Sequence, residues 1–325
     1  MTLRVAPAAR PPWRDRLADR AALATVLLAL CVPLGWLGDW WWPLALIQHF
    51  PVHQAAIALL LAGMLAWARW WKWCAVAGAL ALWCAGWAAA PSWGSPPKAP
   101  EEALRLNLLV ANLNVANDDP RLGEWIARQG ADIVILIECA PRHIAAVRTR
   151  LDASHPHQRL MPRTDAFGIA VFSTRPFAAQ THRMIHGGVP MLDLAWNDPA
   201  WRLLAAHPVP PIYGDLAAEQ RLQLQDIAAA AATSTGALII AGDLNLTPWA
   251  TGFRRLLHET DTRDSRIGHG LQASWPTWLG PCGIPIDHVL LRGAIAEQRR
   301  TMAVPGSDHR AVLIGIAIPR SAIAQ

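Results

Sequence analysis

Short apolar runs that each end in a polar residue recur through the second two-thirds of the chain. The runs L-N-L-L-V-A, D-I-V-I-L-I, W-R-L-L-A-A and A-L-I-I-A-G are followed by Asn112, Glu138, His207 and Asp243. Buried strands read as such runs, and active sites gather where strands end in loops. The pattern therefore predicts a sheet-based domain with polar groups along one edge.

These runs, with the helix signals between them, predict an order of elements for the domain. Strands are expected at 104–112, 132–138, 168–173, 191–196, 201–207, 237–242, 286–291 and 311–317. Helices are expected at 120–129, 141–151, 215–232 and 248–257, the last with Thr247 as N-cap. Several adjacent strands have no helix between them, so a wholly parallel sheet fits poorly. We expect two mixed sheets packed together with helices outside.

The first 90 residues have a different pattern, of long and almost uncharged apolar runs. They lie at 21–37, 52–71 and 73–90. Runs of about 17–25 apolar residues suit a helix that crosses a bilayer, and tryptophans cluster at their ends, as at a membrane interface. The alternative is a buried helical hairpin of a soluble domain, which three such runs in succession disfavour. We predict a membrane anchor with three transmembrane helices over 1–90, a Pro-rich linker over 91–100 and a catalytic domain over 101–325.

The cations around these runs predict an orientation. Five arginines precede the first run, Arg69 and Lys72 lie between the second and third, and the loop 38–51 has no Lys or Arg. The positive-inside rule then places the N-terminus in the cytoplasm. Three crossings of the plasma (inner) membrane put the domain outside the cytoplasm, in the periplasm. A cleaved signal peptide is a competing interpretation of the first run, but two further runs would still hold the domain.

Charge separates the two parts of the chain. Residues 1–100 hold 12 of the 18 Trp and only 3 of the 24 acids, whereas residues 101–325 carry 21 basic and 21 acidic residues and no lysine. The neutral domain weakens the case for a nucleic-acid substrate, because duplex affinity comes largely from cations on phosphates. Two cysteines of the domain, Cys139 and Cys282, could pair in an oxidising compartment, which geometry and not sequence decides.

Eight polar residues form the candidate site. They comprise four acids, two histidines and two amides: Glu138, Asp243, Asp287, Asp308, His207, His309, Asn112 and Asn245. Each alone has an ordinary structural interpretation, such as a strand-ending turn for G-D-L-N or a loop histidine for His207-Pro208. Asn112 also has a rival in Asn114, on the same face of the strand.

In this order the residues resemble the endonuclease/exonuclease/phosphatase superfamily, which has the DNase I-like fold, over roughly residues 103–317. The matching pieces are V-A-N (110–112), D-I-V-I-L-I-E (132–138), A-H-P (206–208), A-G-D-L-N (241–245), I-D-H (286–288) and S-D-H-R (307–310). The segments H-P-V-P-P (207–211), Q-R-L-Q-L (220–224), G-D-L-N-L-T-P-W (242–249) and G-S-D-H-R (306–310) are similar to a membrane-anchored bacterial branch.

The resemblance implies a four-layer α/β sandwich with its site at one end of two sheets. The sequence also departs from the pattern of the family at two points. Ser274-Trp275-Pro276 stands where relatives tend to have Thr-Trp-Pro. The domain's single tyrosine, Tyr213, gives no clear counterpart to the catalytic tyrosine of the DNA-repair branch, which disfavours an abasic-site nuclease.

The chemistry of phosphodiester hydrolysis assigns a role to each candidate. The reaction needs a charge clamp, a positioned water and protonation of the leaving oxygen. Glu138 and Asn112 are the expected ligands of Mg²⁺ or Mn²⁺, and Asp308 would complete this metal site. His309, held by Asp287, is a base or phosphate clamp, and Asp243 orients water or assists the metal. Asn245 donates to transition-state oxygens and His207 acts on the leaving side; the sequence leaves the base open between Asp243 and His309.

The sequence therefore predicts a membrane-anchored, divalent-metal-dependent phosphoesterase that acts on phosphodiesters outside the cytoplasm. Its substrate is nucleic acid or a lipid headgroup, the N-terminal helices contact the bilayer, and no protein partner is indicated. The alternative from another class is a catalytically inactive, membrane-bound interaction module. The intact set of acids, amides and histidines disfavours that alternative.

Overall fold

The structure of the protein is a computed structural model that describes residues 11–320. The chain divides into two compact units, one that ends at Ala88 and one that begins at Ala89. The units are described separately.

The first unit is entirely helical. Its elements are α1 (Pro12–Leu34), η1 (Gly35–Leu37), α2 (Trp42–Ile47), α3 (Pro51–Trp67) and α4 (Trp71–Ala89), which runs on into η2 (Ala90–Ser92). Leucine and tryptophan side chains such as Leu60, Leu82 and Trp83 are exposed along these helices. Such surfaces suit an apolar environment.

By length and composition, two helical segments in the described residues could cross a membrane, not the three predicted. They are Pro12–Leu37, of 26 residues, and Trp71–Ser92, of 22 residues. The apolar helix between them, Pro51–Trp67, has 17 residues. At about 1.5 Å per residue it spans about 25 Å, short of a hydrocarbon core of about 30 Å. It ends early because Arg69 adopts a left-handed backbone conformation with φ 64°.

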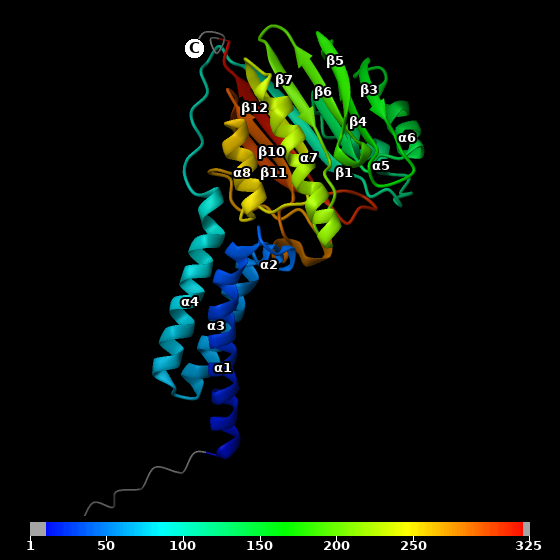
Figure 1. Ribbon diagram of the computed structural model, residues 1–325. Helices are drawn as coiled ribbons and strands as arrows, with labels where there is room; N and C mark the ends of the chain where they lie inside the picture. The colour runs from blue at the N-terminus through cyan, green and yellow to red at the C-terminus, as the bar shows by residue number, and fades with distance from the viewer. Residues whose placement is uncertain (1–10, 321–325) are drawn as a thin grey trace, which may run out of the picture. The chain divides into compact units, whose positions relative to one another are not determined.

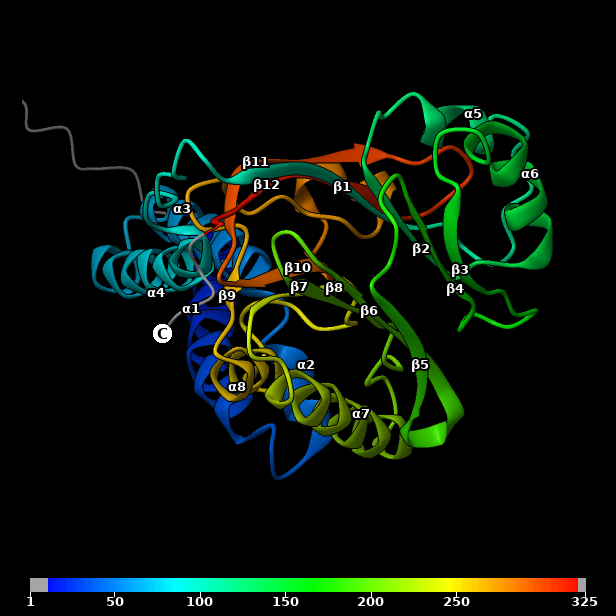
Figure 2. The same ribbon diagram turned by 90° about the horizontal axis from the view of Figure 1, so that it is seen from above.

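Two six-stranded mixed sheets form the second unit (Figures 1 and 2). The first has the order β11-β12-β1-β2-β4-β3 and contains β1 (Leu104–Asn112), β2 (Ile133–Ile137), β3 (His157–Met161), β4 (Ile169–Ser173), β11 (Ile295–Ala303) and β12 (Arg310–Ile318). The second has the order β5-β6-β7-β8-β10-β9 and contains β5 (Ala179–Ile185), β6 (Val189–Trp196), β7 (Trp201–Ala205), β8 (Ala237–Asp243), β9 (Arg263–Asp264) and β10 (Asp287–Arg292).

Helices cover the outer face of each sheet, which gives four layers as predicted (Figure 2). They are α5 (Leu122–Ala127) and α6 (Pro141–Leu151) on the first sheet, and α7 (Gly214–Ala232) and α8 (Thr251–Thr260) on the second. Alternate side chains of β1 divide between two cores: Leu108 and Val110 pack between the sheets, and Leu109 packs toward the helices. Because both faces of β1 are buried from Leu108 onward, residues 108–111 form a continuous apolar run.

Several element boundaries differ from the prediction. The helix expected at 120–129 is shorter, Leu122–Ala127, and the one expected at 248–257 begins at Thr251, with Ala250 rather than Thr247 as its N-cap. Strands β3, β5, β9 and β11 were not predicted.

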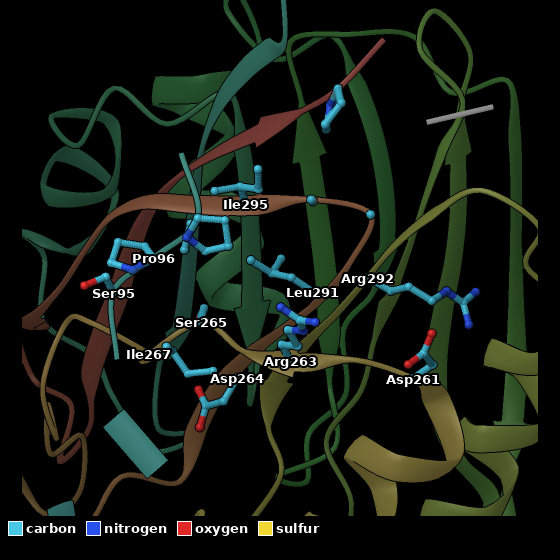
Figure 3. A pocket seen from close by; sticks show the side chains of 15 residues that line it. Ser95, Pro96, Asp261, Arg263, Asp264, Ser265, Ile267, Leu291, Arg292 and Ile295 are labelled. Carbon is cyan, nitrogen blue, oxygen red and sulfur yellow. The ribbon is translucent and has the colours of Figure 1, made fainter. Parts of the chain in front are cut away.

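The Pro-rich segment 91–100, predicted to join neither neighbour, is part of the second unit and contacts its other residues. The amide of Gly268 donates a hydrogen bond to the carbonyl of Ser92 (2.9 Å), and a side chain at Gly268 would meet Pro96. Pro96 also lines a cavity of about 460 Å³ near the end of β10, with Leu291 and Ile295 (Figure 3). None of the eight candidate site residues lines this cavity.

Candidate active site

The strand ends that carry the candidate residues lie together at one end of the two sheets, where the central strands stop. Strands β1 and β2 are parallel, so Asn112 and Glu138 both lie at carboxyl ends. In the second sheet β7 and β8 are parallel, which places His207 and Asp243 together. Strand β10 is antiparallel to β8 and begins where β8 ends, so Asp287 pairs directly with Asp243.

Asn112 joins the two sheets at this edge. Its Nδ2 donates to Glu138 Oε1 (2.9 Å) and to Asp243 Oδ2 (3.1 Å), and its Oδ1 accepts from the amide of Asn114 (2.9 Å). The side chain is fully buried. The structure thus places Asn112, rather than Asn114, between Glu138 and Asp243. The amide nitrogen faces both carboxylates, and rotation of the amide by half a turn would present its oxygen instead.

His309 and Asp287 form a buried pair. Asp287 Oδ2 accepts a hydrogen bond from His309 Nδ1 (2.9 Å), which leaves His309 Nε2 3.7 Å from Asp243 Oδ2. The turn that carries His309 is itself fixed, because Ser307 Oγ accepts from the His309 amide (3.0 Å) and donates to the Asn112 carbonyl (2.9 Å). A carboxylate on Nδ1 sets the ring orientation and directs Nε2 toward the site.

His207 completes the group around Asp243. Its Nδ1 lies 3.0 Å from the Asp243 carbonyl and 3.9 Å from Asp243 Oδ2, and its Nε2 lies 3.8 Å from Glu138 Oε1. Its ring packs against Phe167, with 5.6 Å between centroids. The imidazole is therefore oriented through Nδ1, with Nε2 toward the carboxylates.

Asn245 and Asp308 lie beside this group and are held by other contacts. Asn245 Nδ2 donates to the Pro208 carbonyl (2.9 Å), and the Asn245 amide donates to Asp243 Oδ1 (2.9 Å). Asp308 accepts from Asn114 Nδ2 (2.8 Å) and Trp275 Nε1 (2.8 Å). Neither Asn114 nor Trp275 was predicted to hold Asp308; the alternation that made Asn114 a rival to Asn112 was the one available signal.

Electrostatics at the site follow from burial and crowded charge. Burial and the charge of Asp287 raise the pKa of Asp243 to about 6. Burial alone would lower the pKa of His309, but the charges of Asp287, Asp243 and Asp308 raise it to about 10. Burial would raise the pKa of Asp308, yet its hydrogen bonds from Trp275 and Asn114 hold it below the usual value. The site therefore carries an excess of negative charge that favours a cation.

A divalent cation fits this donor set. Ligand atoms of Asp243, Asp287 and His309 all lie within 4.8 Å of one another. Asp287 Oδ1 is buried without a hydrogen-bond partner, and Glu138 shares the Asn112 amide with Asp243. Hard cations such as Mg²⁺ bind carboxylate oxygens of this kind. Of the predicted ligands, Asp308 is not one of these three clustered residues, and its oxygens accept from Asn114 and Trp275.

The two cysteines of the domain are unpaired, so the possible Cys139–Cys282 disulfide is absent. Cys139 is fully buried behind the site, and burial raises the pKa of its thiol to about 12. Cys282 is exposed.

Comparison with known proteins shows the family of the chain. The family model described as "Endonuclease/Exonuclease/phosphatase family" matches residues 109–309, which include all eight candidate residues. None of the curated protein sequences matches the chain.

Solved structures confirm the fold of the second unit. A humanized TDP2 from Danio rerio is 15% identical, covers 65% of this chain and 98% of its own, and has a TM-score of 0.53. A protein of the same family from Beutenbergia cavernae is 18% identical, with coverage of 66% and 72% and a TM-score of 0.53. A sphingomyelinase C from Streptomyces griseocarneus is 17% identical, with coverage of 65% and 99% and a TM-score of 0.51. At these identities the likeness shows the fold alone.

Proposed function

Because the chain belongs to the endonuclease/exonuclease/phosphatase family, we propose that it is a divalent-metal-dependent phosphodiesterase whose site is built on Asp243. One observation carries the proposal. The Asp243 carboxylate is faced by Asn112 from the first sheet, by His207 from the end of β7 and by His309 from the turn before β12. A carboxylate enclosed by two histidines and an amide is suited to positioning water beside a phosphate.

Glu138 and Asn112, with Asp308 beside them, are the proposed residues that hold Mg²⁺ or Mn²⁺. When bound, the cation would neutralise charge on the phosphate oxygens. The role of Asn112 requires its oxygen to face the cation, whereas its amide nitrogen faces Glu138 and Asp243 in the structure.

Asp243 and the side chains around it would each have one role in the reaction. Asp243 accepts a proton from the attacking water. The three surrounding carboxylates favour protonated His309, so its Nε2 binds a non-bridging oxygen of the phosphate, and Asp287 holds the ring in place. Doubly protonated His207 keeps its Nδ1–H on the Asp243 carbonyl and gives its Nε2 proton to the leaving oxygen. Asn245 has two Nδ2 protons; one binds the Pro208 carbonyl and the other remains for a transition-state oxygen.

The substrate is a phosphodiester of nucleic acid or lipid. Proteins with this fold include TDP2, solved with single-strand DNA product, and a sphingomyelinase C. Nucleic acids and phospholipids both contain the phosphodiester P–O bond that this site would hydrolyse.

We further propose that residues 1–90 anchor the enzyme in the plasma (inner) membrane, with the N-terminus cytoplasmic and the catalytic unit, from about residue 101, periplasmic. The cations beside the first helix and at Arg69 and Lys72 support this orientation. It requires α3 to cross as well, with local thinning of the bilayer accommodating its 17 residues.

Hydrolysis by the purified full-length chain tests the function. Bis(4-nitrophenyl) phosphate should be cleaved with Mg²⁺ or Mn²⁺ present, and EDTA should stop the reaction. Asp243→Asn and His309→Gln should each lower kcat by about a hundredfold or more. His258→Gln, at an exposed position of α8, is the matched control and should retain full activity.

Two outcomes would contradict the proposal. Activity that survives both site substitutions would remove these residues from the chemistry. A wild-type chain inactive on every phosphodiester and phosphomonoester, with any divalent metal, would favour the inactive interaction module.

A further inference from the structure

Exposed hydrophobic side chains of the second unit gather on two loops. Seven large ones are exposed between residues 89 and 320: Trp93, Met184, Ile212, Tyr213, Leu222, Trp275 and Trp278. Four of them lie on two segments, 208–213 and 275–282, here named the rim loops. Trp278 is 79% exposed and Tyr213 64%. Apolar groups concentrated in this way mark an interaction surface.

Both rim loops border the candidate site. The first follows His207 directly, and its Pro208 carbonyl accepts from Asn245 Nδ2. The second begins at Trp275, which donates to Asp308 and whose ring centroid lies 6.4 Å from that of His309. In Figure 1 the start of α7 and the chain before β10 lie at the same edge of the sheets. A surface that contacts the rim loops would therefore bring its phosphates to the site.

The rim loops contain no charged residue. Their sequences are P-V-P-P-I-Y and W-P-T-W-L-G-P-C. Two arginines of the first sheet's side of the unit are engaged elsewhere: Arg142 donates to the carbonyls of Val115 and Asn117, and Arg163 pairs with Asp165. A nucleic-acid strand needs cations along its phosphates, and the rim loops supply none. Tryptophan and tyrosine, by contrast, are the side chains favoured at the surface of a bilayer.

Resting on the proposed phosphodiesterase function, we propose that the rim loops dock on a lipid bilayer and that the site hydrolyses the phosphodiester of a phospholipid. Water forms a new bond from its oxygen to phosphorus, and the bond from phosphorus to the diacylglycerol oxygen breaks. Asp243 takes a proton from that water, and His207 gives a proton to the leaving alkoxide. The products are diacylglycerol and a phosphorylated headgroup. The apolar helices of the same chain keep the enzyme at its substrate surface.

The proposal is tested by comparing hydrolysis of a phospholipid in vesicles with hydrolysis of a soluble phosphodiester by the same protein. The full-length chain is reconstituted in vesicles of phosphatidylethanolamine and phosphatidylglycerol, and release of water-soluble phosphorylated headgroup is measured. Bis(4-nitrophenyl) phosphate is the soluble substrate. Trp278→Ser and Tyr213→Ser should each lower headgroup release by about tenfold, because one interfacial aromatic contributes on the order of 1.4 kcal/mol. Hydrolysis of the soluble diester should be unchanged, since neither side chain touches the reacting groups.

Met184→Ser is the control. Met184 is an exposed apolar residue of β5 (51% exposed) and lies outside both rim loops. It should leave headgroup release unchanged; a loss equal to that of Trp278→Ser would overturn the docking role of the rim loops. An unchanged rate on vesicles in both rim variants would overturn it as well.

The wild-type chain separates this proposal from the one on which it rests. Cleavage of the soluble diester and of single-stranded DNA, without headgroup release, would overturn the lipid substrate and leave the phosphodiesterase function intact. Inactivity on all three substrates would overturn both.

Discussion

Asp287 shows how one carboxylate orients another catalytic group. Its Oδ2 accepts from His309 Nδ1, and the pair is buried. In Asp287→Asn the size of the side chain is kept but its charge is lost, so protonated His309 is no longer stabilised or correctly oriented. We expect kcat to fall by roughly 10²–10⁴ while KM changes much less. Steady-state kinetics on bis(4-nitrophenyl) phosphate measures both.

Asp152→Asn is the control for this variant. Asp152 is an exposed acid at the end of α6, where it pairs with Arg148, and its loss should leave kcat unchanged. A kcat within about threefold of wild type in Asp287→Asn would show that the pair serves structure rather than catalysis.

His207 has a role that depends on the leaving group. Its Nε2 faces Glu138 and its Nδ1 is held by the Asp243 carbonyl. An alkoxide has a high pKa and needs a proton when it leaves, whereas nitrophenolate needs little help. His207→Ala should therefore slow an alkyl phosphodiester far more than a nitrophenyl one, which parallel rate measurements would show.

The other outcomes for His207→Ala are equally informative. An equal loss on both substrates would assign the ring to stabilising charge in the transition state. No loss on either would return His207 to the ordinary role of a loop histidine.

At the level of elements, the sequence predicts the interior strands and misses the edges. Strands β2 and β8 are buried throughout and β1 and β12 over most of their length, and all four contain apolar runs. The four missed strands, β3, β5, β9 and β11, are the outer strands of the two sheets. Their sequences, such as A-Q-T-H-R-M-I in β5, are polar because an exposed edge discourages pairing with another chain. Strand order also depends on contacts between distant segments, which local pattern does not contain.

The end of β8 depends on the absence of a side chain at Gly242. This residue has φ 147°, and a Cβ there would lie 1.9 Å from the Ala206 carbonyl oxygen of the neighbouring strand segment. Gly242→Ala would push apart the segments that carry His207 and Asp243. We expect the melting temperature of the catalytic unit to fall by several degrees and hydrolysis to fall by about tenfold or more.

Gly252→Ala, in the first turn of α8, is the control. A Cβ at Gly252 would make ordinary contacts of 3.4–3.5 Å with Leu246 and Leu224, so stability should be unchanged or slightly raised. If Gly242→Ala matched it in both melting and activity, the close approach of these two segments would not matter for the site.

Across the whole molecule, residues far apart in sequence form the site. The sequence indicates candidates where apolar runs end, such as Asn112, Glu138 and His207, and the structure brings these strand ends together. It did not predict that Asn112 would present its amide nitrogen to Glu138 and Asp243, or that Asp308 would be held by Trp275 and Asn114. Such contacts arise from the packing of one sheet on the other, and no spacing along the chain encodes them.

The topology of the whole chain rests on whether α3 crosses the membrane. With three crossings and a cytoplasmic N-terminus, a reporter active only outside the cytoplasm should be active after Gln325 and silent between Arg69 and Lys72. A fusion in the loop 38–50 should be active in either case and serves as the positive control.

If the 17 residues of α3 do not cross, α4 returns the chain to the cytoplasm and the pattern reverses. The reporter is then active between Arg69 and Lys72 and silent after Gln325. That result would place the catalytic unit in the cytoplasm, where the lipid surface available to the rim loops is the inner leaflet. The hydrolysis proposed for the site would remain possible there, because the groups around Asp243 all come from the second unit.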